Sequence, residues 1–290
     1  MMKFSVTAAA ASAALLAAAF AAPAAAEDVE IRDAVARVVV MVEDRADVAV
    51  EVSPGTANLP PIKVTRRGDK LFVDGDLGRN AIRNCRSGPA GARQPGEGAV
   101  VEVRDRGRIN LSEAPLIIIR SPRAVDVSAE GAVFGSVGRG ATSIELGAGG
   151  CGDWTVANTA GRMSLAVGGS GAIRAGTSAS LEAAVGGSGS ILAGATRDLE
   201  ASVGGSGSIT VARVDGHGEV AIGGSGDVTV RAGAMNKLDV AIGGSGNVDF
   251  PGSVGDLDVA IAGSGDVRVG SVSGRVERAV LGSGNVRVGA

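Results

Sequence analysis

The feature that most constrains the fold is a Gly-Ser-Gly triplet that recurs through the second half of the chain at steps of 18 to 20 residues. The first glycines of the copies are Gly169, Gly187, Gly205, Gly224, Gly244, Gly263 and Gly282, and the variant Gly150-Cys151-Gly152 precedes them. A repeat of this length is too short for a strand, a helix and a return segment, and no stretch within it has the period of a helix. Helical solenoids and leucine-rich repeats are therefore excluded, and short strands joined by tight turns remain.

Apolar residues alternate on both sides of each turn, which is the period of a β-strand. The position two residues before the first glycine holds Ala148, Val167, Val185, Val203, Ile222, Ile242, Ile261 and Val280, and the position four residues after it holds Trp154, Ile173, Ile191, Ile209, Val228, Val248, Val267 and Val286. We expect each coil to pair in parallel with the next at ~4.8 Å, with the right-handed winding that such crossovers favour. Val185, Val203 and Ile222 should then lie directly above one another, and the turn glycines should adopt positive φ.

The sequence before the repeats is also strand-rich. Residues 27–128 contain short β-type runs broken by Pro, Gly and Asp, and we expect this section to cap the first coil. Residues 80–98 carry Pro89 and Pro95 and no apolar period, which predicts a loop. Residues 129–290 are predicted to form the coils. The fold class is all-β: a single-stranded right-handed parallel β-helix, a solenoid, with an N-terminal β-rich capping section, and 27–290 as one continuous domain.

The GGSG turns followed by Ile or Val resemble those of a known family, the putative auto-transporter adhesin head GIN domain. The upstream segments AVARVVVMVEDRADVAVEV, KLFVDGD and PLIIIRSPRAVDVSAEG are similar to the opening strands of that family. The resemblance covers nearly the whole of residues 27–290 and implies a right-handed parallel β-helix without assigned catalytic residues. Cys85 and Cys151 are not part of the general repeat pattern.

The N-terminus and the cysteines indicate export. In residues 1–26, Lys3 precedes an alanine- and leucine-rich stretch that ends in small residues, which is typical of a secretory signal peptide cleaved after Ala26. We expect a periplasmic or secreted chain that does not span the membrane after cleavage, because no later apolar run reaches the ~18 residues that a span needs. In an oxidising compartment Cys85 and Cys151 are expected to form a disulfide, although two unrelated thiols are the alternative.

A column of carboxylates is the most suggestive candidate site. The position five residues before the first glycine holds Glu145, Glu182, Glu200, Glu219, Asp239, Asp258 and Glu277, with Ser164 in the remaining coil, and these seven acidic residues are called the acidic row below. Their parity is opposite to that of the core positions, so they should face solvent on one side of the solenoid. Two interpretations stay open: a surface that binds divalent cations or a basic partner, and a solvated face that prevents aggregation of a flat sheet.

Other chemistry has little support. His217 is the only histidine, and no GxSxG nucleophile motif or phosphate-binding loop is present. Aspartates that follow the turns do not match the nine-residue spacing of calcium-binding β-rolls, so neither a metal site nor a cofactor is expected. The 28 basic and 31 acidic residues leave a net charge of −3, which gives no electrostatic drive toward nucleic acid.

These patterns favour an exported, non-catalytic structural or adhesin-like module that presents a repetitive surface at the cell envelope. Its partner would be a glycan or a protein of the envelope or exterior, and end-to-end self-association through the last coil is a further expectation. The alternative is a polysaccharide lyase or hydrolase on a β-helix, an architecture that such enzymes share. The chain has six aromatic residues in total, and such enzymes need aromatic platforms for sugar rings.

Overall fold

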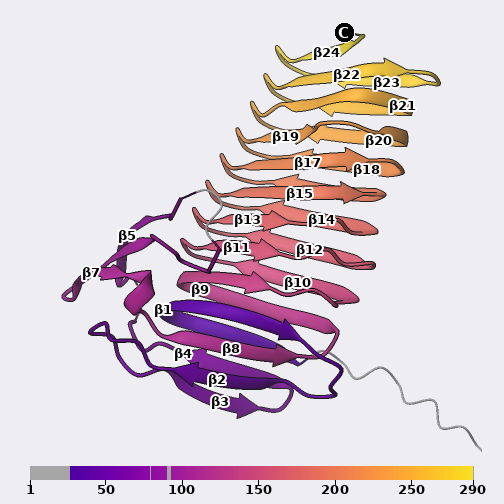
Figure 1. The fold of residues 1–290 in the computed structure, drawn as a ribbon. Helices are drawn as coiled ribbons and strands as arrows, with labels where there is room; N and C mark the ends of the chain where they lie inside the picture. The colour runs from indigo at the N-terminus through magenta and orange to yellow at the C-terminus, as the bar shows by residue number, and fades with distance from the viewer. Residues whose placement is uncertain (1–26, 79, 90–92, 290) are drawn as a thin grey trace, which may run out of the picture.

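The computed structural model describes residues 27–78, 80–89 and 93–289, so the predicted signal peptide lies outside the described residues. The chain forms a parallel β-solenoid of about 9 turns in which 61% of the described residues are in strands. The described residues contain no α-helix. Figure 1 shows the coils stacked one upon another, with the last strand, β24, at one end and β2 and β3 at the other.

The N-terminal section contains β1 (Asp28–Val42), β2 (Ala49–Ser53), β3 (Lys63–Arg67), β4 (Lys70–Asp74), β5 (Ile82–Arg86), β6 (Val100–Val103), β7 (Gly107–Asn110), the 3₁₀ turn η1 (Leu111–Glu113), β8 (Leu116–Ser121) and β9 (Ala124–Val137). The coils contain β10 (Ser143–Ala148), β11 (Asp153–Val156), β12 (Arg162–Val167), β13 (Ala172–Ala175), β14 (Ser180–Val185), β15 (Ser190–Thr196), β16 (Asp198–Val203), β17 (Ser208–Val214), β18 (His217–Ile222), β19 (Asp227–Val230), β20 (Ala234–Ile242), β21 (Val248–Ile261), β22 (Asp266–Val272), β23 (Val276–Val280) and β24 (Asn285–Val288).

The predicted stacking of the core is confirmed. Val185 pairs with Val203, and Val203 pairs with Ile222, so these side chains lie one above another as expected. On the opposite side of the core, the column that begins with Trp154 continues in register through Ile173 and Ile191. These residues are at most 2% exposed, and because the inner positions are aliphatic in nearly every coil, the core is continuous.

The reason for glycine in the turns differs from the predicted one. Within the Gly-Ser-Gly copies only Gly282 has a positive φ, so the bend itself does not require glycine elsewhere. A Cβ on Gly205 would instead lie 2.2 Å from the carbonyl oxygen of Gly187 in the preceding coil. That same oxygen accepts hydrogen bonds from the N–H groups of Ser206 and Gly207, each at 3.1 Å. Glycine is therefore required because the backbones of successive turns approach closely.

Asp and Asn side chains complete the turns. Asp227 Oδ1 accepts hydrogen bonds from the backbone and side-chain N–H groups of Asn247 one coil later, at 3.0 and 2.9 Å. Asn247 Oδ1 in turn accepts from the N–H of Asp266 at 3.1 Å, and Asp266 Oδ1 accepts from Asn285 at 3.1 Å. These oxygens are used in coil-to-coil contacts, which is the turn chemistry typical of Asp and Asn.

The solenoid begins upstream of the Gly-Ser-Gly copies. β9 pairs on one side with β10 and β11 and on the other with β1, which therefore forms a further layer of the stack. β4 and β8 pair in parallel with β1, and β3 and β2 then pair antiparallel with β4 and β8. The antiparallel strands change the direction of pairing at this end of the solenoid, and they cover the edge that β4 and β8 would otherwise expose.

A small antiparallel sheet of β5, β6 and β7 lies beside the solenoid (Figure 1). The prediction of a loop over residues 80–98 is wrong for Ile82–Arg86, which forms strand β5 and pairs with β6. This pairing joins two separate segments, so the local sequence does not reveal it. The sheet covers Val35, Ala132 and Phe134, which form a second core with Val101 and other residues of the sheet. This explains why four successive residues of β9, 132–135, are all buried.

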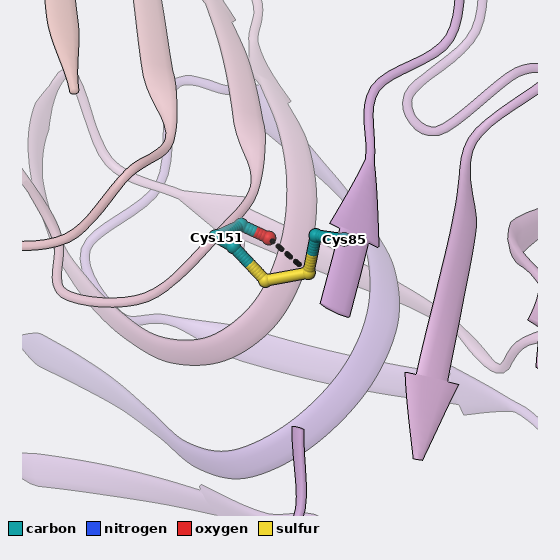
Figure 2. Close-up of a disulfide and its surroundings, with 2 residues drawn as sticks. All are labelled: Cys85 and Cys151. Atoms are coloured by element: carbon teal, nitrogen blue, oxygen red, sulfur yellow. Dashed lines mark hydrogen bonds between the residues drawn. A yellow bond between two sulfur atoms is a disulfide. The ribbon is translucent and has the colours of Figure 1, made fainter. Parts of the chain in front are cut away.

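The predicted disulfide links this sheet to the coils. Cys85 in β5 is joined to Cys151, which occupies the place of serine in the first turn of the repeat, and their Cα atoms are 6.1 Å apart (Figure 2). The bond spans 66 residues of sequence. In a chain-entropy model a loop of this length stabilises the folded state by about 4 kcal/mol.

The coil formed by β23 and β24 has a different environment. Within the described residues these strands pair on one side only, with β21 and β22. Leu281 is 78% exposed, and Val280 and Val288 are 39% and 37% exposed. Arg278 stands in a core column yet is exposed. An apolar coil stacked on this end would enclose the charge of Arg278. The cost of burying that charge opposes the end-to-end association expected from the sequence.

Candidate functional site

The acidic row is a single line of side chains in register. Each member pairs with the residue at the same position in the next coil, from Glu145 through Ser164 to Glu277. All of these residues are exposed or half-buried, as their parity predicts. Because successive parallel strands are ~4.8 Å apart, the row presents carboxylates at that spacing, interrupted only at Ser164.

Two further carboxylates extend the acidic row beyond the predicted members. Asp126 in β9 pairs with Glu145. Asp28 in β1 comes next, because its neighbour Val29 pairs with Val127. The alignment on Gly-Ser-Gly missed both residues because their coils lack the triplet. Gly131 could have identified Asp126 from the sequence. It stands where the first glycine of a turn would be, one layer before Gly150, and Asp126 is five residues before it.

Basic side chains neutralise part of the acidic row. Lys70 pairs with Asp28 and Arg162 with Glu182, while Lys237 Nζ lies 2.6 Å from Asp239 Oδ1 and Arg275 Nη1 lies 3.3 Å from Glu277 Oε1. Among the described residues, no ion pair within 4.0 Å involves the other members, which are Asp126, Glu145, Glu200, Glu219 and Asp258. Uncompensated negative charge therefore lies on the N-terminal side of the Ser164 gap, in the middle of the solenoid and at Asp258, whereas Glu182 on the other side of the gap is paired with Arg162.

Asp126 shows the effect of this crowding. Burial, together with the negative charges of Asp28 and Glu145, raises the pKa of the Asp126 carboxyl to about 6. Lys70 opposes the rise but does not cancel it. At neutral pH this carboxylate is therefore ionised in an unfavourable environment, and a cation placed beside it would lower its free energy.

The surface over the acidic row is shallow and its carboxylates do not converge. A hollow of about 570 Å³ is lined by Glu182, Glu200 and Glu219 together with Asp198 and His217. His217 is exposed, and its Nδ1 lies 3.4 Å from Asp198 Oδ1. Within the described residues no three His, Cys, Asp or Glu side chains are arranged to hold a metal ion. The geometry thus suits several separate contacts along a line better than one enclosed ligand.

Comparison with known proteins gives the family. A family model described as putative auto-transporter adhesin, head GIN domain, matches residues 30–214 and 212–290. The chain belongs to this family. The resemblance seen in the GGSG turns and the upstream strands is confirmed, and the solenoid agrees with the fold that it implied. The family description and the disulfide are typical of a protein that works outside the cytoplasm.

Other comparisons add less. No curated protein matches the chain. Among solved structures, a putative lipid binding protein from Parabacteroides distasonis ATCC 8503 is similar, with a TM-score of 0.42 and 17% identity over 90% of this chain and 92% of that chain. Within the described residues, no helix has the length and hydropathy that crossing a membrane requires.

Proposed function

We propose that this GIN-domain protein is an exported, non-catalytic binding module of the cell envelope, and that its acidic row binds a basic protein segment. The observation that carries the proposal is the register of the acidic row, in which carboxylates at the same position of successive coils stand at one-coil spacing. The adhesin-like family description supports a binding role.

The electrostatics favour a partner with several positive charges. Two like charges about 4 Å apart repel by about 1 kcal/mol in water, and the members of the acidic row are separated by little more than this distance. A partner that places lysine or arginine beside several of them relieves repulsion at each contact. Individually weak contacts then add along one rigid line, which gives useful avidity without a deep pocket.

The proposal includes export with cleavage after Ala26, which would leave Glu27 at the N-terminus of the mature chain. Glu27 Oε2 accepts a hydrogen bond from the N–H of Val48 at 3.0 Å, and Glu27 Oε1 pairs with Arg66. Glu27, the residue that would begin the mature chain, is thus held to the fold by its side chain. N-terminal sequencing of the exported protein should give Glu27, and a retained N-terminal segment would contradict the cleavage.

Binding is tested with a defined lysine-rich peptide, titrated by calorimetry at several salt concentrations. The variant Glu145→Gln, Glu200→Gln, Glu219→Gln should bind at least tenfold more weakly and with a smaller salt dependence, because these carboxylates lack ion-pair partners. The matched control is Asp44→Asn, Glu102→Gln, Asp249→Asn, which removes the same charge from exposed sites elsewhere. Equal weakening in both variants would mean that only net charge matters and would refute a binding role for the acidic row.

The non-catalytic part of the proposal has its own test. Purified protein is incubated with acidic and neutral polysaccharides, and the products are followed for new reducing ends and unsaturated sugars. We expect no turnover. Turnover that survives repurification would establish the polysaccharide lyase or hydrolase alternative instead.

A further inference from the structure

A second candidate site lies away from the acidic row, where the small sheet meets the coils. A pocket of about 330 Å³ separates the segment after β5 from the outer face of β9, β11 and β13. Its coil side includes Ser136, Asp153, Thr155 and Arg174, and its other side includes Pro89, Arg93, Gln94, Pro95 and Glu97. The volume is at the lower end of the range for small-molecule sites, about 300 to 1,000 Å³.

The coil side of this pocket is a regular array of polar side chains. Ser136, Thr155 and Arg174 are at the same position of three successive layers, because Thr155 pairs with Ser136 on one side and with Arg174 on the other. Asp153 lies two residues before Thr155 on the same face of β11. Two hydroxyls, one carboxylate and one guanidinium are therefore held by a rigid sheet with spacing set by the solenoid.

The charged side chains of the pocket differ in whether they have partners within the protein. Glu97 Oε2 accepts hydrogen bonds from the N–H groups of Arg93 and Gln94, at 2.8 and 3.3 Å, and so it shapes its own loop. By contrast, no ion pair or side-chain hydrogen bond to Arg93 or Arg174 occurs among the described residues. Arg93 and Arg174 are exposed and thus contribute to the lining of the pocket without a partner among the described side chains, which favours an anionic ligand.

The geometry points to a binding site for a carboxylate-bearing sugar, such as one hexuronic acid residue of an acidic polysaccharide. The guanidinium groups of Arg93 and Arg174 suit the sugar carboxylate, because arginine presents paired donors that match its two oxygens. Ser136, Thr155 and Asp153 supply donors and acceptors for sugar hydroxyls. Pro89 and Pro95 offer C–H surface to the ring. The site shares no residue with the acidic row and does not depend on it.

The disulfide holds the two sides of this site together. Cys85 is one residue before Arg86, where β5 ends, and the pocket lining begins at Gly88. Cys151 is two residues before Asp153. One covalent bond thus joins the segment that forms the outer side to the turn that leads into the inner side. Reduction removes this restraint but leaves the coil-to-coil pairing of the solenoid unaffected, so ligand affinity should fall without loss of the fold.

Trp154, the sole tryptophan, provides an optical probe. It lies against Gly135, a residue of the pocket wall: a Cβ on Gly135 would be 2.3 Å from the Trp154 ring. Oxidised full-length mature protein is titrated with galacturonic acid trimer, glucuronic acid, galactose and inorganic phosphate, and binding is followed by tryptophan fluorescence and calorimetry. We expect saturable binding of the uronic acids, and at least tenfold weaker binding of galactose and of phosphate.

Variants test the assignment. Arg174→Gln should weaken uronic acid binding at least tenfold. The control is Arg287→Gln, at the same position of the last described coil, which should bind like the wild type. Absence of saturable uronic acid binding, unchanged affinity in Arg174→Gln, or preference for phosphate would each overturn the proposal. Equal affinity before and after reduction, with an unchanged circular dichroism spectrum, would contradict the role given to the disulfide.

Discussion

The two ends of the solenoid are built differently. At the N-terminal end, β1 is sandwiched between β9 and the pair β4 and β8, and its residues Val38 and Val40 are fully buried. At the other end, β24 contributes Val286 and Val288 to the same kind of inner column, yet Val288 is 37% exposed. Inner-column valines are therefore fully buried at one end and partly exposed at the other.

The difference shows that coil stacking alone does not complete a core. A coil is fully buried only when a layer lies on each side of it, and the antiparallel strands β2 and β3, with the small sheet, supply that cover at the N-terminal end. The coil of β23 and β24 has one neighbouring layer among the described residues. We therefore expect its local stability to be the lowest in the solenoid.

The largest effect is expected for alanine at a turn glycine in the middle of the solenoid. A Cβ on Gly207 would be 2.2 Å from the Gly189 oxygen, and both neighbouring layers prevent relief, so Gly207→Ala should destabilise by about 3 kcal/mol. At Gly284 the same contact is 2.4 Å, but this turn can shift, so Gly284→Ala should cost about 1 kcal/mol. Thermal unfolding with hydrogen exchange measures both.

Gly204→Ala is the matched control for the turns, because a Cβ at Gly204 would meet nothing within 4 Å. It should leave the unfolding temperature nearly unchanged. Equal destabilisation by Gly204→Ala and Gly207→Ala would show that backbone freedom, and not the close approach of successive turns, explains the glycines.

A second test removes the same atoms from each end. Val38→Ala removes side-chain atoms from a fully buried position in β1. It should lower the free energy of unfolding by about 2 kcal/mol, because apolar burial is lost and a cavity remains. Val288→Ala removes partly exposed atoms and should change the free energy of unfolding by less than about 0.5 kcal/mol. Similar losses at the two positions, measured by denaturant titration, would mean that the last coil is covered in solution.

The smallest effect concerns two charges near opposite ends of the acidic row. The pKa of the Asp126 carboxyl is raised from 3.8 to about 6 in the folded protein, so folding favours the protonated form. The contribution of that form to the free energy of unfolding is lost as the pH rises through this interval. Asp126→Asn should therefore be more stable than the wild type by about 1 kcal/mol at pH 7.5, after allowance for solvent screening, and equal to it below about pH 4.

Glu277→Gln is the comparison for that pH effect at the other end. Glu277 is exposed and pairs with Arg275, so we expect no comparable gain at pH 7.5. Unfolding curves recorded between pH 3.5 and 8 for both variants distinguish the two cases. A pH-independent difference between Asp126→Asn and the wild type would show that packing, and not charge, is responsible.

The part of the fold that repeats was predictable from the sequence. The columns around the turn glycines predicted strands, parallel register and the aliphatic core, because each coil reports the same two-residue period. Strand β5 was not predictable in the same way. Its partner β6 lies across a proline- and glycine-rich segment, and only the pairing itself and the cover over Phe134 reveal it.

The candidate sites were predictable only in part. Seven members of the acidic row followed from the repeat, whereas Asp28 and Asp126 depend on layers without the triplet. The pocket beside the disulfide was not foreseen, because the shared repeat position of Thr155 and Arg174 does not show that another segment covers them. They acquire a shared environment only when the segment after β5 lies over them.

The lengths of the coils have a consequence for how such a molecule changes in evolution. Between Val211 and Gly218 there are fewer residues than between Val230 and Leu238, yet the turn glycines and the inner columns remain in register. Small insertions are absorbed at the corner opposite the glycine turn. Duplication or deletion of a whole coil would therefore alter the reach of the protein, and the number of ligand contacts it offers, without redesign of its interior.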